Sequence, residues 1–127
     1  MPLVLERPDY AYSLRGADGR HALVNERTLT SSFIVAPDVL VESWPMTDVT
    51  AMRPADLDAL FALQPELVVL GSGETQAFPP ADVIATCLQR GIGLETMTNA
   101  AAARTYNVLA SEGRRVVAGF VLTGDTA

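Results

Sequence analysis

The stretch that decides the fold is ELVVLGSGETQAFPP, residues 66–80. Residues 66–70 hold a continuous apolar run, which is typical of a strand that a parallel sheet buries on both faces. The Gly-Ser-Gly-Glu segment at 71–74 ends this run, and Pro80 suits the first position of a helix. The stretch therefore predicts a strand, a glycine turn and a helix in succession.

Working outward, the chain after residue 46 alternates helix and strand. The patterns predict helices near 54–63, 80–90 and 98–111, and strands near 66–70, 92–95 and 115–121. The inner face of the second helix is predicted to hold Val83, Ile84, Cys87 and Leu88. These elements make a βαβαβ unit over residues 47–127.

The first 46 residues are instead rich in strand signals. Runs at 10–14, 21–24, 27–36 and 38–44 carry β-branched and aromatic residues, and Pro37 separates the last two. An Asp-Gly pair between the first two runs favours a tight turn. Residues 1–46 are therefore predicted to form an antiparallel β-meander, and residues 1–127 a single α/β domain.

The composition is that of a globular chain without a basic surface. Hydrophobic residues make up 49% and charged residues 19% of the 127. A net charge of −6, with nine basic residues spread along the chain, argues against nucleic acid or an anionic membrane as a partner. One cysteine and one histidine exclude an internal disulfide and the common zinc sites. We therefore expect no metal and no cofactor.

Targeting signals are also missing from the sequence pattern. Residues 1–20 contain no apolar core of signal-peptide length, and no stretch is long enough for a membrane span. A soluble, cytoplasmic protein without membrane insertion is the expectation.

The glycine turn allows three interpretations. Glu95 lies 22 residues after Gly73, as an acidic residue does in dinucleotide-binding folds, but Gln76 stands at the third glycine position and prolines delay the helix. Classical nucleotide binding is therefore not expected. The turn either serves only the backbone, with a positive φ at a glycine, or lines a polar pocket with residues 95–98 at the carboxyl ends of two parallel strands.

Two segments, ELVVLGSGETQAFP (66–79) and GIGLETMTNAAAARTYNVLASEGRRVVAGFVL (91–122), resemble a known small α/β family. It includes mitochondrial complex I assembly factor 3 and the adipogenesis-associated single-domain proteins, and its bacterial members are mostly uncharacterised. The resemblance implies a three-layer fold around a mixed central sheet, with the meander as an added layer, and no established catalytic activity. Because a transit-peptide-like start is missing here, a mitochondrial role is not expected to carry over.

The resemblance also supplies a candidate pocket, which we place beside the glycine turn. The resemblance implies seven of its residues, Gly71, Gly73, Met97, Thr98, Arg104, Thr105 and Asn107. Ser72, Glu74 and Glu95 join them because they are expected at the carboxyl ends of two neighbouring strands. Trp44 belongs to the same pattern and is expected in the core. Each of these residues also has a structural explanation, since Thr98 can cap a helix and Met97 can pack in the core.

An enzyme is less well supported than an interaction module. A Ser–His pair is not expected, because the serine motif G-x-S-x-G is absent and His21 lies in the meander, far from Ser72 in the sequence. Glu74 and Glu95 could form a carboxylate pair, and Cys87 is expected to be buried. The sequence favours a non-catalytic, assembly-factor-like module that binds a protein partner or forms a homodimer; the alternative is a small-molecule- or anion-binding protein or enzyme with its pocket at 71–74 and 95–98.

Overall fold

The structure, a computed structural model, describes residues 10–124. The expectation about signal and transit segments concerns residues 1–20, and its first nine residues lie outside the described part.

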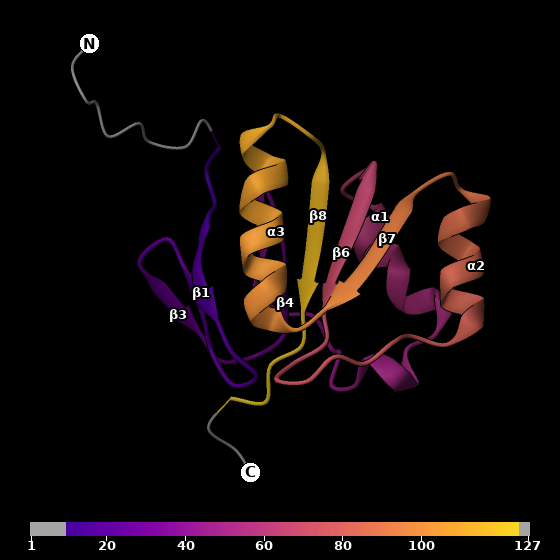
Figure 1. Ribbon diagram of the computed structural model, residues 1–127, viewed down its shortest axis with the longest axis horizontal. Helices are drawn as coiled ribbons and strands as arrows, with labels where there is room; N and C mark the ends of the chain where they lie inside the picture. Colours follow the sequence, from indigo (N-terminus) through magenta and orange to yellow (C-terminus); the bar gives the residue numbers. More distant parts are fainter. Residues whose placement is uncertain (1–9, 125–127) are drawn as a thin grey trace.

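A five-stranded sheet forms the centre of the molecule, with strand order β5-β4-β8-β6-β7 (Figure 1). Its members are β4 (Phe33–Ala36), β5 (Val39–Val41), β6 (Leu67–Gly71), β7 (Gly93–Met97) and β8 (Val116–Phe120). β6 pairs in parallel with β7 and β8, whereas β4 pairs antiparallel with β8 and β5. The α/β class and the mixed central sheet are thus confirmed.

A second, antiparallel sheet and several helices cover the two faces of the central sheet. The second sheet consists of β1 (Leu14–Ala17), β2 (Ala22–Val24) and β3 (Arg27–Leu29). The helical elements are η1 (Val49–Ala51), η2 (Pro54–Leu57), α1 (Asp58–Phe61), α2 (Ala81–Gln89) and α3 (Asn99–Ser111). The helices and strands predicted after residue 46 lie within two residues of their expected bounds, although the first helix starts as a 3-10 turn.

Alternation along the strands produces two cores, one on each face. Val69 of β6 packs toward α3 and the β1–β3 sheet, which lie side by side in Figure 1. Its neighbours Val68 and Leu70 pack toward α1 and α2 on the opposite face. Such alternation is what a strand period of two dictates when both faces are covered. The molecule therefore has the three layers that the family resemblance implies.

The prediction for residues 27–36 is wrong in one respect, because the run is two strands in different sheets. β3 ends at Leu29, and β4 begins at Phe33 in the central sheet. The buried hydroxyl of Ser32 donates to the Met46 carbonyl oxygen at 2.6 Å and accepts from the Leu122 N–H at 3.0 Å. These bonds hold the chain at the point where it passes from the antiparallel sheet into the central sheet. β4 and β5 therefore belong to the central sheet and not to the meander.

The prediction that Ile84 and Leu88 face inward on the second helix is also wrong. Val83 and Cys87 are fully buried, but Ile84 is 38% and Leu88 73% exposed. In a helix the latter two lie about 100° around the axis from the former two. Since α2 packs on the edge strand β7 and on η2, it buries only a narrow stripe.

Trp44 lies in the core, as expected, and its ring packs over Gly119 of β8. A Cβ atom on Gly119 would stand 2.7 Å from the ring, so the close approach requires glycine. Cys87 is likewise buried, and burial raises the pKa of its thiol.

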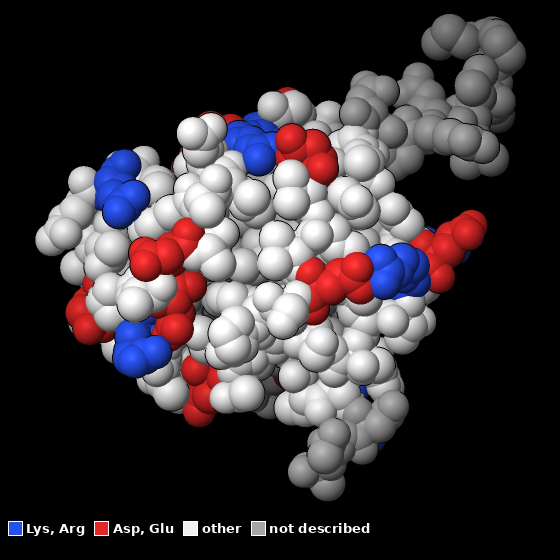
Figure 2. All heavy atoms as spheres, turned by 180° about the vertical axis from the view of Figure 1, so that it is seen from behind, with Lys and Arg blue, Asp and Glu red and all other residues white. Residues whose placement is uncertain are grey.

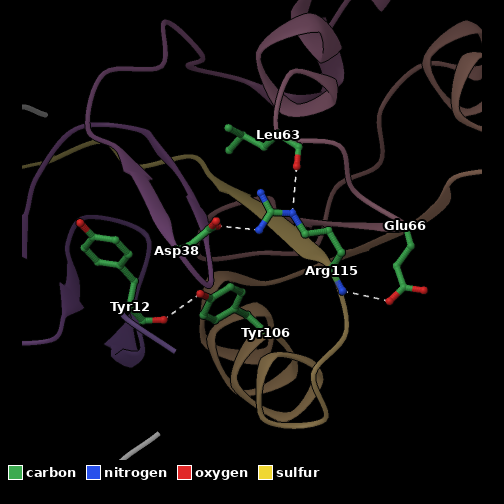
Figure 3. Close-up of polar contacts among 6 residues, drawn as sticks. All are labelled: Tyr12, Asp38, Leu63, Glu66, Tyr106 and Arg115. Atoms are coloured by element: carbon green, nitrogen blue, oxygen red, sulfur yellow. Dashed lines mark hydrogen bonds and ion pairs between the residues drawn. The ribbon is translucent and has the colours of Figure 1, made fainter. Parts of the chain in front are cut away.

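Arg115, which directly precedes β8, binds the segment that leads into β6 and the turn between β4 and β5 (Figure 3). Its Nε donates to the Leu63 carbonyl oxygen at 2.9 Å, and its Nη1 donates to Asp38 at 2.6 Å. Its backbone N–H donates to Glu66 at 2.9 Å. The hydrogen bond from Arg115 holds the pKa of Asp38 below its usual value. This end of the sheet is therefore joined by structural contacts.

Candidate functional site

The glycine turn and the end of β7 lie next to each other, because β6 and β7 are parallel neighbours. Gly71 is opposite Met97 in the pairing register, and the Ser72 N–H donates to the Met97 carbonyl oxygen at 2.8 Å. The structure thus brings residues 71–74 and 95–98 together at the carboxyl ends of the strands, the usual place of ligand sites in open α/β sheets.

Asn99 is the central residue of this corner, and it is fully buried. Its side-chain Oδ1 accepts from the Gly73 N–H at 3.1 Å, and its Nδ2 donates to the carbonyl oxygens of Asp18 and Val121, both at 2.8 Å. Its backbone N–H donates to the Gly73 carbonyl oxygen at 2.9 Å. One amide group thereby connects the glycine turn, the β1–β2 hairpin and the end of β8.

Thr98 caps α3, with its hydroxyl accepting from the Ala101 N–H at 3.3 Å. The sequence predicted Thr98 as a possible cap, and it did not place Asn99 among the candidate pocket residues. No local pattern could have done so, since the partners of Asn99 come from three distant segments.

The polar groups of the turn are already engaged in structural hydrogen bonds. The Ser72 hydroxyl lies 2.8 Å from the Thr75 carbonyl oxygen and accepts from the Ala77 N–H at 3.0 Å. The Glu74 carboxylate accepts from the Gly19 N–H at 2.9 Å. A nucleophilic serine would need a neighbouring base instead of these backbone partners.

The β1–β2 hairpin reaches the turn in space despite its distance in sequence. Gly19 contacts Glu74 so closely that a Cβ atom there would stand 2.9 Å from the Glu74 Cβ. The hairpin, which also carries His21, therefore contacts the glycine turn directly, although more than 50 residues separate the two in the sequence. Between them lies an open hollow of about 370 Å³. Its lining residues are Gly19, Arg20, Thr47, Ser72, Gly73, Glu74, Val121 and Thr123.

Glu95 and Met97 point to the face of the central sheet that carries α3. Glu95 is opposite Val69 in the register and is exposed, while Met97 packs against the core on that face. In the described residues no hydrogen bond joins Glu95 to Glu74, which instead binds the hairpin. The Glu74 carboxylate therefore has a structural partner in the hairpin.

The remaining predicted residues lie away from the turn, beside β1. Asn107 donates from Nδ2 to the Leu14 carbonyl oxygen at 2.6 Å and accepts at Oδ1 from the Leu14 N–H at 2.9 Å. Arg104, one turn earlier on α3, is exposed and lines a separate groove with Asn107. Thr105 is half-buried between them on the helix. The predicted set therefore divides into a turn cluster and a β1 cluster.

The sequence of this chain matches a known protein family. A family model described as "Protein of unknown function (DUF498/DUF598)" matches residues 14–121. The chain belongs to this family.

Three relatives illustrate its range. The solved structure of Xanthomonas campestris XCC1710 is 60% identical, covers 100% of this chain and 96% of that chain, and superposes with a TM-score of 0.85. NADH dehydrogenase (ubiquinone) 1 alpha subcomplex assembly factor 3 of Danio rerio is 28% identical over 88% of this chain and 62% of that protein. A Francisella tularensis "13 kDa major membrane protein" is 32% identical over 64% of this chain and 66% of that protein. The matches span less than two thirds of either of these two curated relatives.

The resemblance seen in the sequence is confirmed, since the family has no defined function and an assembly factor is among the relatives. Across residues 10–124, no helix is long and apolar enough to cross a membrane. In this family member, the segment 97–107 carries both Asn99 and Asn107, and each binds the backbone of the β1–β2 hairpin. The part of the sequence that carries the resemblance thus holds the meander in place.

Replacing Asn107 with alanine is expected to lower the free energy of unfolding by about 1–2 kcal/mol. The change removes both bonds to Leu14 and leaves a half-buried N–H and carbonyl without protein partners. Urea denaturation measures the loss, and amide NMR signals of β1 should shift most. Val108→Ala, at an exposed neighbour, serves as the control and should change stability by about 0.5 kcal/mol or less. Unchanged β1 signals in Asn107→Ala would contradict the docking role.

Proposed function

We propose that the protein is a non-catalytic interaction module of the assembly-factor type, acting in the cytoplasm through a protein partner or a second copy of itself. One observation carries the proposal: within residues 10–124, β7 pairs only with β6, and α2, which packs on β7, exposes the apolar side chains of Ile84 and Leu88. A partner strand commonly binds by adding to an unpaired sheet edge that has apolar surface next to it.

The register identifies which backbone groups of β7 face outward. Gly93 donates its N–H to Glu66, and Met97 accepts at its carbonyl from Ser72, so these residues bond inward to the β6 side. Because the two directions alternate along a strand, the N–H and C=O groups of Leu94 and Thr96 point away from β6. Gln76 supports this assignment, since its Nε2 donates to the Thr96 carbonyl oxygen at 3.0 Å. The groups of Leu94 and the N–H of Thr96 are left for a partner strand.

The helix α2, next to β7, adds exposed apolar side chains to this end of the molecule. Leu88 and Ile84 lie one helical turn apart on α2, and α2 packs against β7. α2 and β7 are at the same end of the molecule in Figure 1, away from the meander. Seen from behind, charged side chains of both signs are scattered around a broad uncharged area (Figure 2).

A photo-crosslinking residue, p-benzoylphenylalanine, placed at Leu88 tests the proposal in living cells. We expect a covalent adduct at Leu88 with at least about fivefold higher yield than at Val108, which is also exposed (56%) but lies on α3. The adduct's mass distinguishes a second copy from a different protein.

The proline variant Leu94→Pro removes the outward N–H that strand addition needs and leaves the inward bonds of β7 intact. It is expected to abolish the adduct at Leu88 while the NMR spectrum of the rest of the fold persists. Equal adduct yields at Leu88 and Val108, or an adduct that survives Leu94→Pro, would contradict the proposal.

The hollow at the glycine turn supports a second candidate, a small-molecule binding protein or enzyme. Its lining offers backbone groups and the polar side chains of Thr47 and Thr123. A small molecule retained in native mass spectrometry, and lost in the hollow-filling variant Thr47→Trp, would favour this function over the first.

A further inference from the structure

The groove between β1 and α3 is built differently from the two surfaces described so far. It has a volume of about 270 Å³. Four of its lining residues are small, Gly16, Ala17, Ala100 and Ala103, and the others are Leu14, Arg15, Arg104 and Asn107. A Cβ atom on Gly16 would meet nothing within 4 Å, so the groove is open there to an approaching backbone. Both arginine side chains are exposed beside it.

These two arginines differ from the other arginines that the structure describes. Among residues 10–124, neither Arg15 nor Arg104 has an ion pair, hydrogen bond or ring contact within the chain. The others are engaged as follows: Arg20 with the Gly124 carbonyl, Arg27 with Glu42, Arg53 with Asp56, Arg90 with the Phe61 ring, Arg114 with Glu66 and Arg115 with Asp38. In a chain of net charge −6, the two arginines that are unpaired among residues 10–124 thus line one groove.

The backbone of β1 contributes to this arrangement. The pairing of β1 with β2 shifts register between Leu14 and Gly16, so Arg15 occupies an irregularity of the strand. Such bulges redirect a side chain relative to a regular strand. On the other side, the double hydrogen bond between Asn107 and Leu14 fixes β1 against α3 and thereby fixes the two walls of the groove. Both ends of the Asn107 amide are engaged with Leu14. The two guanidinium groups are therefore the groups that can bind a ligand.

Two like charges beside one groove repel each other, and an anionic ligand relieves that repulsion. Guanidinium groups bind carboxylates in a planar, bidentate manner that ammonium groups cannot match. Half of the lining residues are small and the space at Gly16 is open, so the backbone of an extended chain can approach the groove. Positive charge at this place in an acidic protein also favours encounter with an acidic segment.

We propose that the β1–α3 groove binds an acidic segment of a partner protein, with one carboxylate at Arg15 and another at Arg104. This inference rests on the interaction function proposed above, but it concerns a surface separate from the β7 edge. The crosslinking result at Leu88 therefore reports on the edge alone, and the experiment below reports on the groove alone.

The test is an NMR titration of the isotope-labelled protein with an eight-residue capped peptide of alternating Ala and Glu, at about 50 mM salt to limit screening. We expect the Nε–Hε signals of Arg15 and Arg104 to shift, while those of the paired arginines stay in place. The matching Ala–Gln and Ala–Lys peptides should cause no shift. Arg15→Ala and Arg104→Ala should each weaken binding about fivefold or more, and Arg53→Ala, at another exposed arginine, by less than about twofold.

Three results would overturn the inference. One is a uniform shift of all arginine signals, which indicates non-specific charge attraction. Another is equal affinity for the Ala–Glu peptide, inorganic phosphate and acetate, which indicates an adventitious ion only. The third is unchanged binding in the double variant Arg15→Ala/Arg104→Ala, whose fold is checked by its amide spectrum. Because both residues are exposed, loss of folding is not expected to obscure the measurement.

Discussion

Replacing Asn99 with alanine is expected to lower the free energy of unfolding by about 3–5 kcal/mol. The amide is fully buried and makes three side-chain hydrogen bonds, to Gly73, Asp18 and Val121. Truncation leaves one N–H and two carbonyl groups of distant segments without their partner, and it opens a small cavity among them. Each buried polar group left unpaired costs more than the bond was worth, so the losses accumulate.

Thermal and urea unfolding measure this effect, and a fall in Tm of about 10–20 °C corresponds to the expected loss. Asn107→Ala provides the matched comparison, because it removes two hydrogen bonds to one segment from a half-buried position. The larger effect of Asn99→Ala should come with new NMR shifts in all three connected segments. A loss below about 1 kcal/mol would show that the corner holds together without the amide.

The elements after residue 46 were predictable because their determinants are local. The apolar run at 67–70, the prolines before helices and the glycines after them follow short-range rules of period and capping. By contrast, the split of residues 27–36 depends on Ser32, whose hydroxyl binds backbone groups of residues 46 and 122. The exposure of Leu88 depends on α2 lying at the sheet edge, which a helical period cannot reveal.

The candidate site was predictable only in part, for the same reason. Parallel pairing of adjacent strands places 71–74 beside 95–98, and this follows from topology alone. The contacts of Asn99 and Asn107 with the meander join residues separated by 81 and 93 positions, so no sequence window contains both partners. The groove with Arg15 and Arg104 likewise forms only when β1 docks on α3.

The two proposed binding surfaces lie on opposite sides of the molecule. β1 and α2 stand at opposite ends of the view in Figure 1, with the central sheet between them. If both proposals hold, the protein can contact an acidic segment and a strand-donating partner at the same time. Bringing two chains together in this way requires no catalytic group, which agrees with the structural use of Ser72 and Glu74. Two partners bound to the same molecule would be held at a high effective concentration relative to each other, which favours their encounter.

Gly71→Ala is expected to destabilise the fold by about 3 kcal/mol or more, through overpacking combined with loss of the Asn99 network. A Cβ atom on Gly71 would stand 2.3 Å from Oδ1 of Asn99 and 3.0 Å from the Phe120 ring. Neither neighbour can move freely, since Asn99 is held by its hydrogen bonds and Phe120 is fully buried and stacks on Phe33. Denaturation with urea measures the loss.

Gly73→Ala separates this steric cause from backbone strain. Gly73 has a φ of +111°, where side chains are strained, but a Cβ atom there would meet nothing within 4 Å. Its expected cost is about 1–2 kcal/mol, from strain alone. Moreover, Asn99→Ala removes the atom that Gly71→Ala strikes, so the double variant Gly71→Ala/Asn99→Ala should lose about 1–3 kcal/mol less than the sum of the single losses. Additive losses would show that the two residues do not act through this contact, because a clash with an atom that is no longer present cannot cost free energy.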